Sequence, residues 1–250
     1  MPVIAHLSDT HLDGSPRAAD RTRAVMAYLD ALPYDLDAVL VSGDVADHGS
    51  PAEYREAREL LSTRHPLLVL PGNHDERAAF RSVLLGEDPV AVDGAPVNRL
   101  HVAEGFAVAL CDSTRPGRDD GWLDEGTLEW LDGVLGSVRV PVLVAFHHPP
   151  VPLGIPYLDG LRQFGAERLA AVTARHPHVA AFLCGHAHLS TATTFAGRPL
   201  VVAPGVVSTA RLPWEARPTP DAHVHRGLPP AVAFHVLDCE GRFATHVRSC

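Results

Sequence analysis

Five short apolar runs in this chain are each followed closely by a polar motif. The motifs are Asp9-Thr10-His11, Gly43-Asp44, Gly72-Asn73-His74-Asp75, His147-His148-Pro149 and Gly185-His186-Ala187-His188. The runs themselves are rich in Val, Leu and Ala, which is typical of strands buried on both faces. In an open α/β sheet, ligands bind beyond the carboxyl ends of the strands. The arrangement therefore predicts that the five motifs gather where strands end.

Strand and helix patterns alternate along the chain. Strands are expected over residues 3–7, 38–42, 67–70, 107–111, 142–146, 179–184, 200–203, 232–237 and 243–247. Helices are expected over residues 17–31, 54–61, 127–135 and 166–176, and Ser50, Pro51 and Glu53 form a capping box before the second of these. The alternation predicts a mostly parallel central sheet, and the strand-rich last third predicts a second, more antiparallel sheet. We expect one domain over residues 1–250.

One segment, residues 211–230, is rich in Pro, His and Arg and has too little apolar content for a core element. Two interpretations stay open. It is either a plain surface loop or a cap over the functional site, since long loops in compact domains often act as lids. His223 and His225 in this segment match none of the motifs, and we expect them on an exposed loop.

The composition narrows the classes of function and the setting. A formal net charge of −9 argues against a nucleic-acid scaffold, which would carry a basic patch. The four Cys form no C-x-x-C pair, which favours reduced thiols in a cytosolic protein. The N-terminus has no signal-peptide pattern, and no apolar run approaches the ~20 residues that cross a bilayer. We therefore expect a cytoplasmic protein without a membrane role.

The motifs offer carboxylates, one amide and several imidazoles, and no thiolate. This set suits a pair of divalent ions such as Mn²⁺, Fe²⁺ or Zn²⁺, and it argues against an iron–sulfur cluster or a Cys-type zinc site. Two metals about 3.5–4 Å apart are a known device for displacement at phosphorus. In extended backbone, residues two apart point the same way, so Asp9 with His11, and His186 with His188, could each serve one centre. Gly43, Gly72 and Gly185 precede ligands and predict tight turns or positive φ.

In this order the motifs resemble those of the calcineurin-like metallophosphoesterase superfamily. The pattern there is D-x-H, G-D, G-N-H-[DE], a His and G-H-x-H, and it is complete here from Asp9 to His188. The wording SDTH, GDVAD, GNHDER, FHHPP and GHAH is most similar to bacterial class III cyclic-nucleotide and glycerophosphodiester phosphodiesterases. The resemblance implies a four-layer α-β-β-α sandwich of two mixed sheets flanked by helices, with a dinuclear metal centre at the strand ends.

The resemblance also implies two sets of metal ligands. One ion would be held by Asp9, His11, Asp44 and His188. The other would be held by Asp44, Asn73, His147 and His186. A carboxylate suits the shared position because it offers two anionic oxygens, whereas a neutral imidazole offers one lone pair. A hydroxide between the metals would be the nucleophile, since coordination lowers the pKa of water to near neutrality.

His74 is the candidate catalytic residue that is not a ligand. Because its neighbour Asn73 takes the ligand position, its ring is free to donate a proton to the leaving oxygen or to stabilise phosphoryl charge. Asp75 is expected either to orient His74 or to cap a helix that starts at Glu76. The family pattern places a ligand at His147, and His148 is expected to line the substrate side.

These features favour a metal-dependent phosphodiesterase that acts on cyclic nucleotides or small phosphodiesters. A diester carries one negative charge and needs few cationic clamps, and the five motifs contain no Arg and the chain no Lys. A phosphomonoesterase is the alternative enzyme, with Arg115, Arg162 or Arg211 as clamps. A non-catalytic metal-binding scaffold is the alternative of another class, and we would expect it to lack His74 or several ligands. The expected partner is a small phosphoester substrate, and a homodimer stays open.

Overall fold

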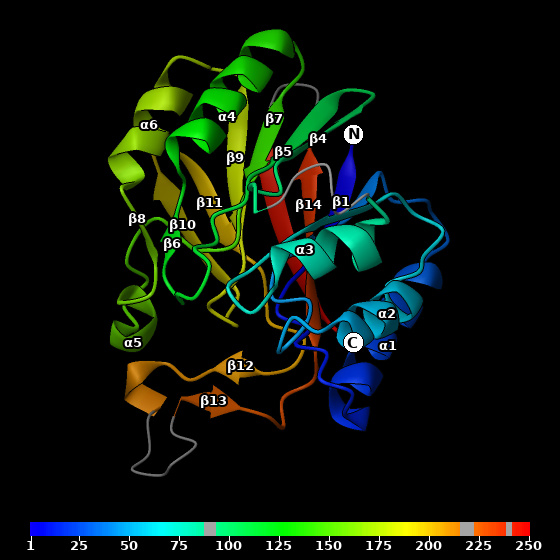
Figure 1. Cartoon of the computed structure of the whole chain (residues 1–250). Helices are drawn as coiled ribbons and strands as arrows, with labels where there is room; N and C mark the ends of the chain where they lie inside the picture. The colour runs from blue at the N-terminus through cyan, green and yellow to red at the C-terminus, as the bar shows by residue number, and fades with distance from the viewer. Residues whose placement is uncertain (88–93, 216–222, 239–241) are drawn as a thin grey trace.

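The computed structural model describes residues 1–87, 94–215, 223–238 and 242–250, and it contains two facing sheets (Figure 1). The first sheet contains, in spatial order, β15 (Phe243–Ser249), β14 (Ala231–Leu237), β1 (Val3–Leu7), β2 (Ala38–Ser42) and β3 (Leu67–Leu70). The second contains β10 (Thr191–Phe195), β11 (Arg198–Val202), β9 (Val179–Cys184), β7 (Val142–Ala145), β5 (Phe106–Leu110) and β4 (Arg99–Ala103).

Both sheets are mixed: the first is parallel on one side and antiparallel on the other, and the second is parallel in the middle and antiparallel at both edges. Strands β1, β2 and β3 pair in parallel, as do β5, β7, β9 and β11. Strands β14 and β15 add antiparallel pairs to the first sheet, and β10 and β4 add them to the second. The expectation of a separate antiparallel sheet from the last third was wrong, because β14 covers the free edge of β1, and β11 extends the second sheet beside β9.

Alternate residues along the strands face two different cores. The inner core lies between the sheets and includes Ile4 and Leu40 of the first sheet with Val108 and Leu143 of the second. A second core joins the outer face of the first sheet to helices α1 (Pro16–Asp30) and α2 (Pro51–Leu60). A third joins the second sheet to α4 (Glu125–Ser137) and α6 (Ala166–Ala174). The order helix, sheet, sheet, helix confirms the expected four-layer sandwich.

The helix starts follow the signals in the sequence. The Ser50 side chain accepts from the backbone of Glu53, whose carboxylate accepts from the Ser50 backbone, so the expected capping box is confirmed. Among the elements that the sequence patterns did not indicate are the edge strand β4 and a π-helix at Phe80–Leu85, which follows the short α3 (Arg77–Ala79). Strand β4 is largely exposed, so it has no apolar run to reveal it.

Short elements lie toward one end of the sandwich, several of them below the sheets in Figure 1. They are α5 (Pro156–Asp159), the pair β6 (Gly121–Trp122) and β8 (Gln163–Phe164), a 3-10 turn (Pro213–Glu215) and the hairpin of β12 (Thr209–Ala210) and β13 (Val224–His225). The hairpin overlaps the segment 211–230, of which residues 216–222 lie outside the described part of the chain. Within the described part, no helix combines the length and apolar character needed to cross a membrane.

Candidate metal centre

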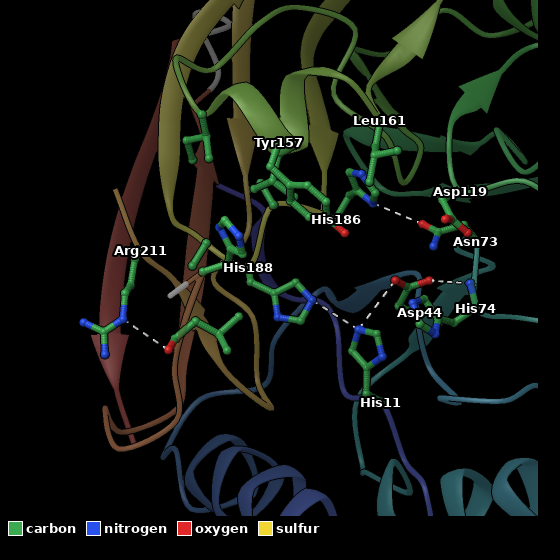
Figure 2. A pocket seen from close by; sticks show the side chains of 16 residues that line it. His11, Asp44, Asn73, His74, Asp119, Tyr157, Leu161, His186, His188 and Arg211 are labelled. Atoms are coloured by element: carbon green, nitrogen blue, oxygen red, sulfur yellow. Dashed lines mark hydrogen bonds and ion pairs between the residues drawn. The ribbon is translucent and has the colours of Figure 1, made fainter. Parts of the chain in front are cut away.

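The carboxyl ends of strands from both sheets meet at the end of the sandwich that carries the hairpin. The first sheet supplies Asp9 after β1 and Asp44 after β2, and the second supplies His147 after β7 and His186 after β9. Figure 2 shows His11, Asp44, Asn73, His74, His186 and His188 around one cavity of about 380 Å³. The motifs therefore meet, as expected, where strands end, but at the junction of two sheets.

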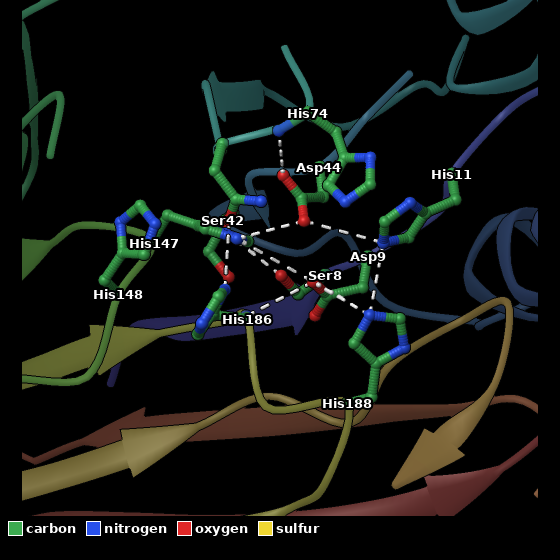
Figure 3. Close-up of polar contacts among 12 residues, drawn as sticks. Ser8, Asp9, His11, Ser42, Asp44, His74, His147, His148, His186 and His188 are labelled. Carbon is green, nitrogen blue, oxygen red and sulfur yellow. Dashed lines mark hydrogen bonds and ion pairs between the residues drawn. The ribbon is translucent and has the colours of Figure 1, made fainter. Parts of the chain in front are cut away.

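The Asp44 carboxylate lies between two groups of imidazoles (Figure 3). Its Oδ2 atom is 3.2 Å from His147 Nε2 and 3.5 Å from His11 Nε2. His11 Nε2 is in turn 3.1 Å from His188 Nε2, which is 3.5 Å from Asp9 Oδ1. Burial disfavours the charged carboxylate, but the nearby imidazoles outweigh it and hold the pKa of Asp44 well below its ordinary value. A carboxylate in this position lies within reach of both groups of imidazoles.

Three imidazoles are held by a hydrogen bond at Nδ1, so that Nε2 faces the centre. His11 Nδ1 is 2.8 Å from the carboxylate of Asp47, His188 Nδ1 is 2.9 Å from Ser208 Oγ, and His147 Nδ1 is 2.7 Å from the Ser42 carbonyl. A bond from Nδ1–H to a carbonyl or carboxylate leaves Nε2 with a lone pair, which is the arrangement of metal-binding histidines.

Several buried polar atoms at the centre have no hydrogen-bond partner among the described residues. They include Asp9 Oδ2, His147 Nε2 and His186 Nε2. Buried polar atoms are normally satisfied, so unpaired ones that converge point to an ion at this place. His186 Nδ1 lies 3.1 Å from Asn73 Oδ1, and burial lowers the pKa of His186 to about 3, so its ring is neutral and able to bind a cation. The donor set therefore fits divalent metal ions.

The backbone at five of the seven proposed ligands is left-handed, which the sequence patterns did not indicate. Positive φ values between 41° and 68° occur at Asp9, His11, Asp44, His186 and His188. Among the non-glycine residues that the structure describes, Ala196 is the one other case. The expectation of extended backbone at the pairs Asp9/His11 and His186/His188 was therefore wrong. Such conformations cost about 1–3 kcal/mol each and cluster at functional sites, where surrounding contacts hold them.

Two of the glycines allow the close packing of the centre. Gly43 has a φ of +99°, and a Cβ atom there would lie 2.4 Å from His147 Nδ1. Gly72 is not in the left-handed region, but its Cβ atom would lie 2.2 Å from Asp44 Oδ1. A side chain at either position would displace a proposed ligand. The expected tight approach of the backbone is thus present at both glycines, and positive φ at the first.

His74 lies at the rim of the cavity with 41% of its side chain exposed. Its backbone N–H donates to Asp44 Oδ1, and its Nδ1 lies 2.8 Å from the Asp47 carbonyl, which only an Nδ1–H can satisfy. The Nε2 atom is then left free, and it can donate a proton only when the ring is an imidazolium. Its ring also packs edge-on against His11, with centroids 4.6 Å apart.

Asp75 has neither of the two expected roles. Its carboxylate accepts from the backbone N–H groups of Val45, Ala46 and Gly72, and from the Tyr54 hydroxyl. Glu76, not Asp75, caps the helix that follows. Asp75 therefore ties the loop after β3 to the loop that carries Asp44, instead of orienting His74. Burial and the charge of Asp44 raise the pKa of Asp75 to about 6.

His148 does not line the substrate side. Its side chain is fully buried, its Nδ1 is 2.8 Å from Ser113 Oγ, and its ring lies 4.7 Å from that of His186. It is close enough to His147 and His186 to form a possible metal-binding group with them. The contact between His147 and Asp44 is nevertheless specific to His147, which supports the expected choice between the two adjacent histidines.

Several contributors to the site were not identified from the sequence. Asp47 falls inside GDVAD, three residues after Asp44, and its spacing was the one available signal. Asp119, Tyr157 and His223 line the cavity from three separate segments, and no local motif marks them. Of the three arginines named as clamps, Arg211 lines the cavity, Arg115 pairs with Asp120, and Arg162 donates to the Asp159 carbonyl.

Comparison with known proteins agrees with the family resemblance of the five motifs. The family model of the calcineurin-like phosphoesterases matches residues 2–190. The chain belongs to this family. Members use dinuclear metal centres, and in this chain the His and Asp groups that could hold metal lie at the strand ends. The wider expectation of a metallophosphoesterase with two mixed sheets is therefore confirmed.

Its relatives include named phosphodiesterases. It is 35% identical over 220 residues to the glycerophosphodiester phosphodiesterase GpdQ of Enterobacter lignolyticus, a match that covers 82% of this chain and 77% of the relative. It is 36% identical to a probable cyclic nucleotide phosphodiesterase of Rhodococcus erythropolis, covering 84% of this chain and 72% of the relative. A dimetal phosphatase from Danio rerio has the same fold, with a TM-score of 0.70, 17% identity and coverage of 99% and 96% of the two chains. Family and relatives together indicate a metal-dependent phosphodiesterase.

Proposed function

We propose that this protein hydrolyses small phosphodiesters, cyclic nucleotides among them, at a centre of two divalent ions. The observation that carries the proposal is the Asp44 carboxylate, placed between His11 on one side and His147 on the other. The donor atoms are carboxylate and amide oxygens and imidazole nitrogens, which Mn²⁺, Fe²⁺ and Zn²⁺ all accept. The relatives that carry phosphodiesterase names support the same class of substrate.

We assign the ligands in two groups that share Asp44. The first group is Asp9, His11, Asp44 and His188. The second group is Asp44, Asn73, His147 and His186. The contacts of Asp44 Oδ2 with His11 and His147 support the shared position, and the 3.1 Å approach of His186 to the Asn73 carbonyl oxygen supports the second group.

The metals would supply a water of lowered pKa as nucleophile and would withdraw charge from the phosphoryl oxygens. The chain's own residues orient the ligands and act on the leaving oxygen. Asp47, Ser208 and the Ser42 carbonyl fix the orientation of the ligand imidazoles, which raises their basicity as ligands. His74 presents Nε2 to the cavity, where its imidazolium form can give a proton to the leaving oxygen or stabilise negative charge in the transition state.

The arginines favour a diester over a monoester. Arg211 lines the cavity, but its guanidinium is already engaged with His225 Nε2 at 2.8 Å and with the Val224 carbonyl. Arg115 and Arg162 are held in contacts elsewhere. A monoester dianion would gain most from a free bidentate clamp, which a singly charged diester does not need. The phosphomonoesterase alternative therefore depends on Arg211 alone among these three.

The deciding experiment compares bis(p-nitrophenyl) phosphate with p-nitrophenyl phosphate on protein loaded with Mn²⁺, Fe²⁺ or Zn²⁺ in turn. We expect a higher kcat/KM for the diester with each active metal, and no turnover after chelation. A preference for the monoester would contradict the proposed substrate class and leave the metal centre in place. Metal-free protein with full activity would contradict the centre itself, and two bound ions without turnover would favour the scaffold alternative.

The cytoplasmic setting and a homodimer remain proposals. Cys111 and Cys184 are free thiols and buried, and Cys250 is a third free thiol, while Cys239 lies outside the described residues. Free thiols are typical of a reducing compartment, which supports the cytoplasm. Cell fractionation tests the setting, and light scattering on the purified protein tests whether it forms a dimer. The cap role of residues 211–230 is likewise a proposal, supported by Arg211 and His223 at the cavity.

A further inference from the structure

The cavity has an apolar wall that phosphate chemistry does not require. Its floor carries the proposed metal ligands, whereas the opposite wall is built from α5, the loop that follows it and the β12–β13 hairpin. The apolar side chains of this wall are Ile155, Tyr157, Leu158, Leu161, Ala210 and Val224. Figure 2 shows Tyr157 and Leu161 across the cavity from His11. The wall therefore faces the position that the ester group of a bound substrate would occupy.

Two flat rings from distant parts of the chain stack within this wall. Tyr157 on α5 and His223 beside β13 have ring centroids 5.3 Å apart and planes inclined by only 21°. Tyr157 is nevertheless 59% exposed, although aromatic rings gain most when they are covered on both faces. Since His223 covers one face of the Tyr157 ring, the other face is left for a ligand.

Both halves of the wall are fixed from outside. Two arginines of α1 hold the ends of the hairpin segment: Arg21 Nε donates to the Val206 carbonyl at 2.6 Å, and Arg17 Nη2 donates to the Arg226 carbonyl at 2.7 Å. On the other side, the Asp159 carboxylate accepts from the backbone ahead of α5. A wall held in this way binds a ligand without a large loss of conformational entropy.

We infer that Tyr157 and His223 form a stacking platform for a flat aromatic ring of the substrate, such as a nucleobase. The inference rests on the proposed function, because it places the phosphorus at the metals and the ring against this wall. Stacking of a base on an aromatic side chain is tolerant of sequence and depends on the π-face of the base. Asp119 lines the same cavity and offers acceptors to an exocyclic amine. A cavity of about 380 Å³ lies within the usual range for small ligands.

The names of the relatives include both glycerophosphodiesters and cyclic nucleotides as substrates. The platform would bind these two classes of diester differently. A cyclic nucleotide carries a ring that can cover the open face of Tyr157, whereas a glycerophosphodiester of a small alcohol carries none. The platform would therefore favour nucleoside phosphodiesters in this chain. The platform contributes to the binding of the ring and not to the chemistry at phosphorus. Its loss should therefore raise KM more than it lowers kcat.

The experiment compares adenosine monophosphate with ribose 5-phosphate, which carries a hydroxyl at C1 in place of the base. Calorimetry on the metal-loaded protein should give a Kd for adenosine monophosphate about tenfold lower than for ribose 5-phosphate. Tyr157→Ala should remove most of this ratio by weakening the nucleotide alone, and Tyr157→Phe should preserve it. His223→Ala should reduce the ratio in part. Trp214→Ala is the matched control, since Trp214 is an exposed aromatic of the same segment.

Two results would overturn the platform. One is an equal Kd for both ligands in the wild-type protein, which needs no variant and so does not depend on any variant folding. The other is a Tyr157→Ala protein that binds both ligands more weakly by the same factor, because that would indicate a disturbed metal centre. Hydrolysis of bis(p-nitrophenyl) phosphate in the same samples tests the proposed function separately. Failure of that reaction with an intact nucleotide preference would contradict the function and support the platform.

Discussion

At the scale of single residues, the centre is marked by buried polar atoms that lack a hydrogen-bond partner among the described residues. Asp9, His147 and His186 each bury an unpaired donor or acceptor, and several proposed ligands adopt left-handed backbone. Both features cost free energy in a protein without an ion. We therefore expect metal binding to stabilise the fold, because an ion that binds only the folded state shifts the unfolding equilibrium. Three predictions follow from individual side chains.

The first concerns Asp44, whose oxygen contacts both imidazole groups. Asp44→Ala should abolish turnover and release at least one ion per chain, because the carboxylate belongs to both proposed ligand sets. Elemental analysis after gel filtration measures the metal content. Asp20→Ala, at an exposed carboxylate on α1, is the control and should keep both ions. Two ions and near-native turnover in Asp44→Ala would show that the bridge is assigned to the wrong residue.

The second concerns His74. His74→Ala should keep both ions and lose about 10²–10⁴-fold in kcat, the usual effect of a positioned acid or base. If His74 donates a proton, the loss should be smaller for a nitrophenol leaving group than for an alcohol. Equal losses for both would indicate charge stabilisation instead. His74 also lies within reach of His11 and Asp44, so loss of an ion would identify it as a ligand.

The third concerns Asp47, which accepts from His11 Nδ1. Asp47→Ala should weaken metal affinity about 10–100-fold, the typical cost of removing the group that orients a ligand histidine. Asp47→Asn should lose less, because its amide oxygen can still accept the same hydrogen bond. Titration of the apoprotein against a metal buffer gives the affinities. Unchanged affinity in Asp47→Ala would mean that the Nδ1 bond does not orient His11.

At the scale of elements, the β12–β13 hairpin is anchored by helix α1, which packs on the outer face of the first sheet. Arg21 of α1 donates to the Val206 carbonyl, ahead of β12. Arg21→Met keeps the apolar stem and removes the donor. We expect KM for a cyclic nucleotide to rise about tenfold with kcat little changed, since a charged hydrogen bond that positions the wall is lost.

Steady-state kinetics on cyclic AMP tests this, with metal content measured on the same samples. Arg23→Met is the control, because Arg23 lies on the exposed face of α1 and pairs with Asp20. A fall in kcat at constant KM, with both ions present, would show that the hairpin acts on the chemical step and not on binding.

At the scale of the whole molecule, a buried chain of histidines links the antiparallel edge of the first sheet to the site. His235 Nδ1 is 2.9 Å from Thr245 Oγ1, His235 Nε2 is 2.9 Å from His6 Nδ1, and His6 Nε2 is 2.8 Å from Ser42 Oγ. Burial lowers the pKa of His235 to about 3, and burial together with His235 lowers the pKa of His6 well below its ordinary value. Both rings are therefore neutral in the folded protein near pH 7.

The unfolded chain binds protons at these histidines below about pH 6.5, while the folded protein does not. The free energy of unfolding should therefore be insensitive to them above about pH 6.5 and fall as pH drops toward 3, by up to about 1.4 kcal/mol per pH unit for each ring. Urea unfolding at pH 7.5 and 5.0 measures the fall. In His235→Gln, which keeps hydrogen-bonding groups but does not titrate, the fall should be smaller. An equal fall in both proteins would contradict the assignment to His235.

The local order of residues determined the core strands, the start of α2 and the motifs of the metal centre. Short apolar runs followed by Gly, Asp, Asn or His were sufficient to predict the core strands, and the observed boundaries either coincide with the expected ones or differ by one or two residues. Strand β5 runs over Phe106–Leu110 where 107–111 was expected. The capping box at Ser50 was predictable because all its partners lie within one helical turn. The family pattern also named the residues that the structure brings together at the strand ends.

Tertiary contacts decided the remainder, because they join residues far apart in the chain. Asp75 is tied to Val45 and Ala46 and not to its neighbour His74, and that pairing depends on how the loops after β2 and β3 pack. His147 and His148 are adjacent and identical in type, and only their packing separates the one that contacts Asp44 from the one that lies against Ser113. The left-handed backbone at the ligands and the stacked pair of Tyr157 and His223 likewise arise where two sheets and a hairpin meet, so no window of sequence contains their cause.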